Sequence, residues 1–170
     1  FAEDAGGNVW IAYRDGTLAR FRNGRFRVLS GRNGIPPSPI AGFARDGRGR
    51  LWASTFGNGL MRIDEPGAEE PVAVLYGPAQ GVSAFHLGEL VVDRDERIVF
   101  ATSRELMRLD PATGVVSEVR AARGILSFDA TGACRDREGR LWFASWNGLA
   151  RLEGGPPPPV NPPTVRISSA

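Results

Sequence analysis

Few residues in this sequence of 170 are of the types that carry out chemistry, and they are scattered. His86 is the only histidine, and no acid or nucleophile stands directly beside it, which favours a structural role. Asp93, Asp95 and Glu96 have the alternating spacing of calcium ligands, but the glycine and the distant glutamate of a calcium-binding loop are missing. The motifs of serine hydrolases, zinc peptidases and nucleotide-binding loops do not occur. We therefore expect no catalytic residue, no metal site and no cofactor.

The composition is that of an ordinary folded domain that is rich in turns. Hydrophobic residues make up 42% and charged residues 24%, and the 22 glycines and 13 prolines favour short elements over long helices. All 21 basic residues are arginines, and 19 acidic residues leave a net charge of +2. No apolar run reaches the length of a membrane span, so we expect no direct membrane insertion. Because the chain opens at FAED without a methionine, we expect it to be a segment of a longer protein.

Two local features have competing interpretations. Residues 20–30, RFRNGRFRVLS, place arginines at alternate positions, which fits a nucleic-acid groove or the solvent face of a strand. The period of two favours the strand, and we expect no nucleic-acid partner. Cys134 is the only cysteine, which excludes an internal disulfide and a site of several cysteines; its small and polar neighbours favour a buried thiol.

One pattern occurs four times along the chain. Each copy has an aspartate, a short turn, a tryptophan or valine six residues after the aspartate, and then a leucine two residues before an arginine. Three of the turns read D-x-x-G, which suits a tight hairpin because glycine tolerates positive φ and aspartate caps the turn. The tryptophan or valine positions are 42, 47 and 43 residues apart. The copies begin DAGGNVWIAY (4–13), DGRGRLWAST (46–55), DRDERIVFAT (93–102) and DREGRLWFAS (136–145).

Each copy predicts one small antiparallel sheet. The second strand carries the tryptophan, and the third carries the leucine and the arginine. The predicted first strands are 1–4, 39–46, 88–93 and 129–136, and the predicted fourth strands are 25–30, 72–77 and 116–120.

Four strands in about 40–50 residues are typical of a β-propeller blade, which must pack against its neighbours to bury its two faces. We predict an all-β fold, a β-propeller fragment of about four four-stranded antiparallel blades, with the tryptophans as spacers between blades. The blades are expected at 1–38, 39–85, 86–128 and 129–153. A proline-rich linker and the start of a following domain are expected at 154–170.

The segments DREGRLWFASWNGLARLE (136–153) and DGRGRLWASTFGNGLMRID (46–64), with NGIPPSPI (33–40), resemble the repeat of two-component regulator propellers. PPPPVNPPTVRISSA (156–170) is similar to the start of the Ig-like domain, named for its three tyrosines, that follows such propellers. The third copy departs from the repeat, with Val99 in place of tryptophan and Glu105 in place of glycine. The resemblance implies a periplasmic or extracellular sensor region of a membrane-anchored hybrid histidine kinase. Its kinase parts would lie outside this chain, and its ligands would include glycans.

One face of the predicted propeller holds the candidate ligand-binding residues. The loops between second and third strands share this face with the loops that lead from one blade to the next, and they vary in charge and aromatic content. Phe56 and Trp146 could form a stacking platform for a sugar or another flat ligand, with hydrogen bonds from neighbouring asparagines; packing of loop against loop is the alternative. The candidates are Tyr13, Arg14, Phe56, Asn58, His86, Arg104, Trp146 and Asn147.

Three functions fit these features. The favoured one is a non-catalytic, ligand-sensing segment of a two-component sensor that binds a small molecule or glycan. The second is a propeller enzyme similar to the streptogramin lyases, whose acid–base chemistry would here depend on His86. The third is a propeller that only docks other proteins. The open faces of a four-bladed fragment also predict self-association or contact with the remaining blades of a parent propeller.

Overall fold

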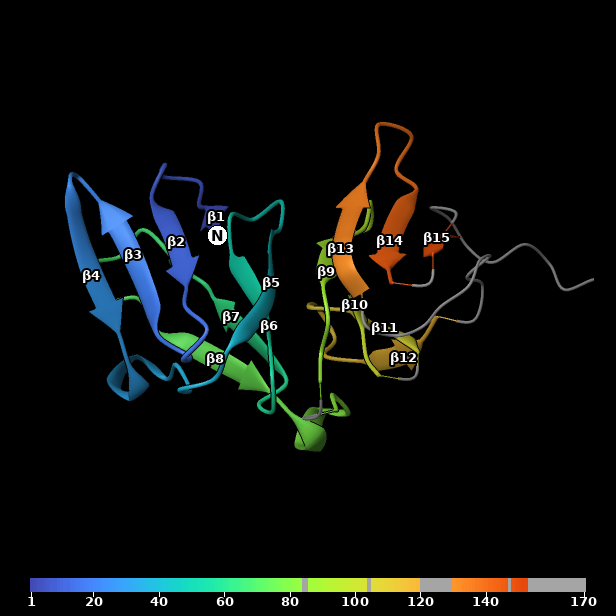
Figure 1. Cartoon of the computed structure of the whole chain (residues 1–170), viewed down its shortest axis with the longest axis horizontal. Coiled ribbons are helices and arrows are strands. Elements are labelled where there is room, and N and C mark those ends of the chain that lie inside the picture. Colours follow the sequence, from blue (N-terminus) through green and yellow to red (C-terminus); the bar gives the residue numbers. More distant parts are fainter. Residues whose placement is uncertain (84–85, 104, 120–129, 147, 153–170) are drawn as a thin grey trace, which may run out of the picture.

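The computed structural model describes residues 1–83, 86–103, 105–119, 130–146 and 148–152 (Figure 1). Four antiparallel sheets follow one another in chain order, and strands adjacent in the chain also pair in each sheet. Short 3₁₀ turns, η1 (Gly31–Asn33) and η2 (Pro78–Gln80), lie in the connections that leave the first and second sheets. The four sheets correspond to the four repeats, so the predicted all-β propeller fragment is confirmed.

The strand bounds agree closely with the repeat. Blade 1 contains β1 (Ala2–Glu3), β2 (Val9–Ala12), β3 (Leu18–Arg22) and β4 (Arg25–Leu29). Blade 2 contains β5 (Ile40–Arg45), β6 (Leu51–Thr55), β7 (Leu60–Ile63) and β8 (Ala73–Tyr76). Blade 3 contains β9 (Leu90–Val92), β10 (Ile98–Ala101), β11 (Leu106–Leu109) and β12 (Val116–Glu118). Blade 4 contains, within the described residues, the three strands β13 (Ala130–Arg135), β14 (Leu141–Ser145) and β15 (Gly148–Leu152).

The aspartate of each repeat closes the hairpin between the first and second strands. In blade 2 the Asp46 carboxylate accepts hydrogen bonds from the backbone amides of Arg48 and Arg50, both at 3.0 Å. Gly49, three residues after the aspartate, has a φ of 80°, in the left-handed region that glycine enters without strain. The same two amide bonds recur at the other three aspartates, which confirms the predicted turn.

The tryptophans join this turn to the packing between blades. Each indole Nε1 donates a hydrogen bond to the aspartate six residues earlier, at 2.9 Å in blade 1 and 2.8 Å in blades 2 and 4. The arginine of the third strand lies over each indole ring, 5.6–5.7 Å from its centroid. Trp10 and Trp52 are fully buried, whereas Trp142 is partly exposed. Burial acts to raise the pKa of Asp46, but hydrogen bonds from Trp52 and Arg50 outweigh it and lower that pKa.

Blade 3 has no tryptophan to donate a hydrogen bond to its repeat aspartate. Val99 is fully buried at the tryptophan position and cannot donate a hydrogen bond. The third-strand arginine, Arg108, instead points its Nε toward the carboxylate of Asp93, at 3.5 Å. The departure of this repeat from the pattern therefore changes the partner of the aspartate and leaves the sheet intact.

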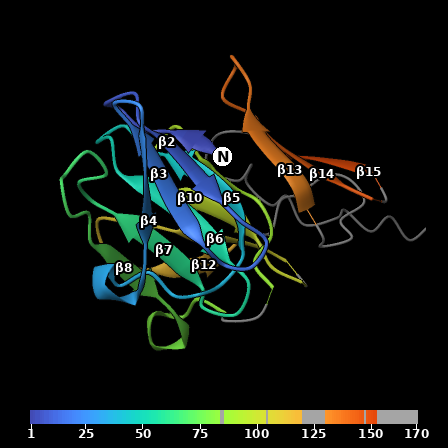
Figure 2. The same ribbon diagram turned by 60° about the vertical axis from the view of Figure 1, so that its left-hand side comes forward.

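Three hydrophobic clusters hold the blades face to face, each built from two successive blades. This arrangement confirms that Trp10 and Trp52 act as spacers, because each belongs to the cluster between its own blade and the next. Figure 2 shows the succession of the sheets from another side, with β13–β15 at one end. The clusters centre on Trp10, Leu18, Leu51 and Ile63; on Trp52, Leu60, Leu90 and Phe100; and on Val99, Leu106, Leu141 and Phe143.

The far face of blade 4 is open in the described structure. Leu60 of blade 2 is 0% exposed because blade 3 covers it, whereas Leu149, at the same register position in blade 4, is 55% exposed. Cys134 pairs with Trp142 as Ala44 pairs with Trp52, so it lies on this open face. The prediction of a buried thiol is therefore wrong, because Cys134 is exposed.

The arginines of residues 20–30 also depart from expectation. Arg20 is only 3% exposed, so the solvent-face interpretation is wrong for it. Its guanidinium donates hydrogen bonds to the carbonyl oxygens of Pro66 and Ala68, at 2.7 and 2.6 Å, in the loop between β7 and β8 of the next blade. The side chain therefore ties blade 1 to blade 2.

The expected linker and following domain at 154–170 lie outside the described residues. Among the residues that the structure does describe, no helix is both long and apolar enough to cross a bilayer.

Candidate functional site

The loops predicted to share one face of the propeller do meet. The amide of Phe56, in the β6–β7 loop, donates a hydrogen bond of 2.9 Å to the carbonyl oxygen of Pro39, in the connection from blade 1. The hydroxyl of Ser38 donates to the carbonyl oxygen of Phe56 in return. These two bonds fix Phe56 beside the start of β5.

The β6–β7 loop holds Phe56 at its tip. The Thr55 hydroxyl donates to the carbonyl oxygen of Gly59 at 2.8 Å and accepts from the amide of Asn58 at 3.2 Å. Gly59 has a φ of 77°, and a Cβ there would collide with the carbonyl oxygen of Tyr76. Only glycine fits this position.

Bulges at the start of the first strands shape the floor of the site. The pairing register skips one residue between Ile40 and Gly42 of β5 and between Ala130 and Gly132 of β13. Ala41 and Thr131 are the residues skipped, and a bulge of this kind redirects the side chain that it carries. β9 lies beside both β5 and β13, and Gly88 stands two residues before Leu90, its first paired residue. The starts of three successive first strands therefore come together.

A cleft of about 250 Å³ opens where these elements meet. The rings of Phe56 and His86 form one wall, edge to face, with centroids 5.6 Å apart and planes at 83°. His86 has a φ of 39°, in the left-handed region that few residues other than glycine adopt. The other lining residues are small or aliphatic: Ala41, Leu87, Gly88, Ala130 and Thr131.

A carboxyl group lies next to this cleft. Glu89 follows the cleft residue Gly88 and reaches toward β5, where a Cβ on Gly42 would collide with its carboxylate. Burial raises the pKa of Glu89. Glycine at position 42 is therefore needed to admit an acidic side chain between two first strands.

Of the six predicted site residues that the structure describes, two come together in the cleft. Phe56 and His86 line the cleft, whereas Trp146, at the tip of the β14–β15 hairpin, is 83% exposed and does not line it. Arg104 and Asn147 lie outside the described residues. Tyr13, Arg14 and Asn58 are exposed on their loops and are not part of the cleft wall.

The cleft floor could not be predicted from residue type. Ala41, Gly88 and Thr131 carry no polar group typical of a site except the one hydroxyl, so residue type gave no reason to choose them. The signal was positional: Ala-Gly at 41–42 and Thr-Gly at 131–132 interrupt the apolar alternation at equivalent places in two repeats. Among the described residues, no three His, Cys, Asp or Glu side chains gather into a metal-binding group.

The architecture is similar to that of solved propellers. The extracellular domain of a hybrid two-component system from B. thetaiotaomicron superposes with a TM-score of 0.72 at 21% identity, covering 88% of this chain and 20% of that one. A catalytically inactive His-to-Ala variant of virginiamycin B lyase from Staphylococcus aureus was solved with quinupristin. It superposes with a TM-score of 0.64 at 16% identity, covering 93% of this chain and 55% of that one. The WD40 β-propeller domain of Doa1 superposes with a TM-score of 0.63 at 15% identity, covering 85% of this chain and 45% of that one.

These likenesses establish the β-propeller fold. The chain spans about a fifth of the sensor domain and about half of the lyase and of the Doa1 domain. No protein-family model matches the sequence, and no curated protein is significantly similar to it.

Proposed function

We propose that this chain is a non-catalytic, ligand-sensing segment of an extracytoplasmic propeller and that the cleft at Phe56 and His86 binds a small neutral saccharide. The observation that carries the proposal is the convergence of two aromatic rings with the starts of three first strands. A site assembled from three blades responds to any ligand that changes how the blades sit against one another.

The chemistry of the lining favours a neutral ligand with an apolar face. Phe56 is 43% exposed, so part of its ring is free to stack on a sugar. The floor of Ala41, Gly88 and Thr131 lets a ligand approach the backbone closely. Among the described residues, the cleft lining includes no arginine and no carboxylate. Its volume is below the ~300–1,000 Å³ of sites for drug-sized ligands, which suits a ligand of about one sugar ring.

The sensor role is supported by two independent features. The repeats at 46–64 and 136–153 resemble those of two-component regulator propellers, and the fold is similar to an extracellular domain of a hybrid two-component system. A parent protein of this kind would place the chain outside the cytoplasm and attach it to a membrane-anchored kinase.

A glycan array followed by calorimetry tests this function. We expect the whole chain to bind one or more neutral saccharides, and Phe56→Ala to weaken that binding by about tenfold, since stacking on an aromatic ring contributes about 1.4 kcal/mol. Phe26→Ala is the matched control, because Phe26 is an exposed phenylalanine on the outer strand β4. Absence of binding, or equal loss in both variants, would refute the proposal and favour a propeller that only docks proteins.

A second candidate is a lyase, because the single histidine of the chain lies in the cleft and the lyase neighbour loses catalysis when a histidine is replaced by alanine. The chain would then open a streptogramin B substrate, and His86→Ala would abolish that activity. Our proposal predicts no turnover of this substrate by the wild-type chain.

A further inference from the structure

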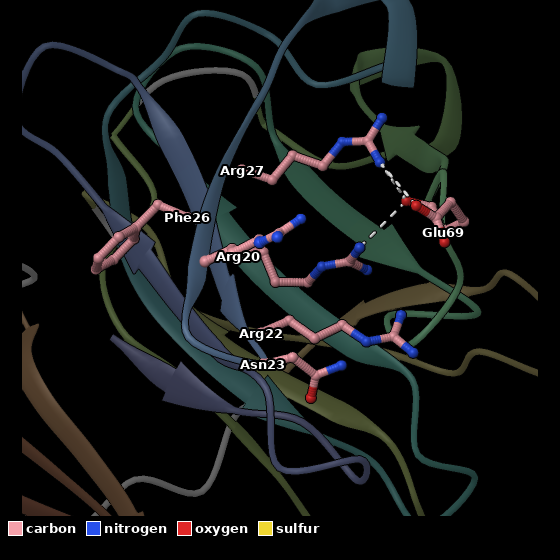
Figure 3. A pocket seen from close by; sticks show the side chains of 7 residues that line it. Arg20, Arg22, Asn23, Phe26, Arg27 and Glu69 are labelled. Carbon is pink, nitrogen blue, oxygen red and sulfur yellow. Dashed lines mark hydrogen bonds and ion pairs between the residues drawn. The ribbon is translucent and has the colours of Figure 1, made fainter.

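A larger cavity, of about 560 Å³, lies away from the cleft, at the outer edge of blade 1. It is bordered by the hairpin of β3 and β4 and by the loop that follows β7 in blade 2 (Figure 3). Its lining residues are Arg20, Arg22, Asn23, Arg25, Phe26, Arg27 and Glu69.

The pairing of β3 with β4 places four arginines on one face of the hairpin. Arg20 stands directly opposite Arg27, and Arg22 directly opposite Arg25. Like charges in such positions destabilise a sheet unless other groups compensate them. The opposite face carries the aromatic pair, and in Figure 3 Phe26 points away from the guanidinium groups.

The inner pair of arginines is compensated by blade 2. Arg20 donates to three carbonyl oxygens of the loop at 66–69. Arg27 donates to the carbonyl oxygen of Glu69 at 2.9 Å and pairs with the carboxylate of Glu70. These contacts explain why the two arginines are present: they latch one blade to the next.

The outer pair is compensated less fully. Arg22 donates a single bond to the carbonyl oxygen of Gly67 in the same loop, at 2.7 Å, and the described residues give the Arg25 side chain no hydrogen bond or ion pair. No described carboxylate pairs with either side chain. Burial, with repulsion from Arg22 and Arg27, lowers the pKa of Arg20.

We propose that Arg22 and Arg25, with the side-chain amide of Asn23, bind a tetrahedral oxyanion, either sulfate or a sulfate ester. A guanidinium group presents two parallel N–H donors that match the oxygens of such an anion. Asn23 and Gly24, with φ values of 49° and 75°, form a two-residue hairpin turn that fixes the spacing of the two arginines. The site shares no residue with the cleft and does not depend on its function.

Inorganic sulfate, titrated into the whole chain at constant ionic strength, tests the site. We expect saturable NMR shifts of the Nε–H signals of Arg22 and Arg25, and weakening of sulfate binding by about tenfold in Arg25→Gln. Arg25 makes no contact with the blade 2 loop, so this variant keeps the latch. Arg48→Gln is the matched control, because Arg48 is exposed on a hairpin turn of blade 2.

Heparin separates the two sources of the anion. If heparin, a sulfated polysaccharide, binds more tightly than inorganic sulfate and Arg25→Gln abolishes that binding, the ligand is a sulfate ester. If heparin and sulfate bind with equal affinity, the ligand is the free ion. The proposal is overturned if the arginine signals do not saturate or if Arg48→Gln weakens binding as much as Arg25→Gln. Tighter binding of a DNA duplex than of heparin overturns it as well.

Discussion

The aspartate–tryptophan pair of each repeat can be tested by one isosteric substitution, Asp46→Asn. The Asp46 side chain is fully buried, and its two oxygens accept four hydrogen bonds. One oxygen accepts the backbone amides of Arg48 and Arg50, and the other accepts Arg50 Nε at 2.6 Å and Trp52 Nε1 at 2.8 Å. Asparagine keeps the shape but replaces one acceptor by an NH₂ group.

Neither orientation of the asparagine amide can satisfy its neighbours. If its oxygen faces the turn amides, its NH₂ opposes the two side-chain donors, and if it is flipped, the NH₂ opposes the two backbone donors. A hydrogen bond to a charged group contributes ~1.5–3 kcal/mol, and a buried donor left unpaired costs about as much. Arg50 can turn partly toward water, but Trp52 cannot. We therefore expect Asp46→Asn to lower the free energy of unfolding by about 3–5 kcal/mol.

Urea unfolding followed by far-UV circular dichroism measures this loss. Asp93→Asn is the matched control, because Asp93 closes the same turn in blade 3 but faces a valine and one arginine nitrogen at 3.5 Å. We expect a clearly smaller loss there. Equal losses at the two positions would show that the indole hydrogen bond contributes nothing to stability.

Three further results are expected. Gly34→Ala should cost at least ~1–2 kcal/mol, measured by urea unfolding, because Gly34 has a φ of 71° and a Cβ would lie 2.6 Å from the carbonyl oxygen of Ala73. The pKa of Asp46 is lowered in the folded chain, so its charged form stabilises the fold at pH values above the unfolded pKa of ~4. Stability should therefore fall as the pH drops from about 4 toward the pKa of the folded state, which thermal melts at several pH values measure. Leu60→Ala should lower the free energy of unfolding by ~2–5 kcal/mol and Leu149→Ala by much less. Because we expect the open face of blade 4 to drive self-association, Leu149→Glu should shift the chain toward an 18.3 kDa monomer in light scattering.

Much of the fold could be predicted from the sequence because each blade is specified locally. The D-x-x-G turns, the strand alternation and the L-x-R strand all lie within about 20 residues of one another, so one repeat predicts its own hairpins. Four copies in one register then require a stack. This local encoding explains why predicted and observed strands agree even in blade 3, where Val99 replaces tryptophan.

What could not be predicted depends on contacts between blades. Arg20 is buried because a loop 46 residues away in the chain supplies carbonyl oxygens to it. Cys134 is exposed because the described structure places no blade against its face. Residue type points to Phe56 and His86, which the structure places in one cleft, whereas the cleft floor is made of small residues whose place follows from strand register alone.

Hydrogen–deuterium exchange with a saccharide found on the glycan array tests whether the cleft is the binding site. We expect added protection at the starts of β5, β9 and β13 and in the β6–β7 loop, at residues 39–43, 55–59, 86–90 and 130–132. Protection confined to the β14–β15 hairpin or to the outer strands β3 and β4, with none at these four segments, would contradict this expectation.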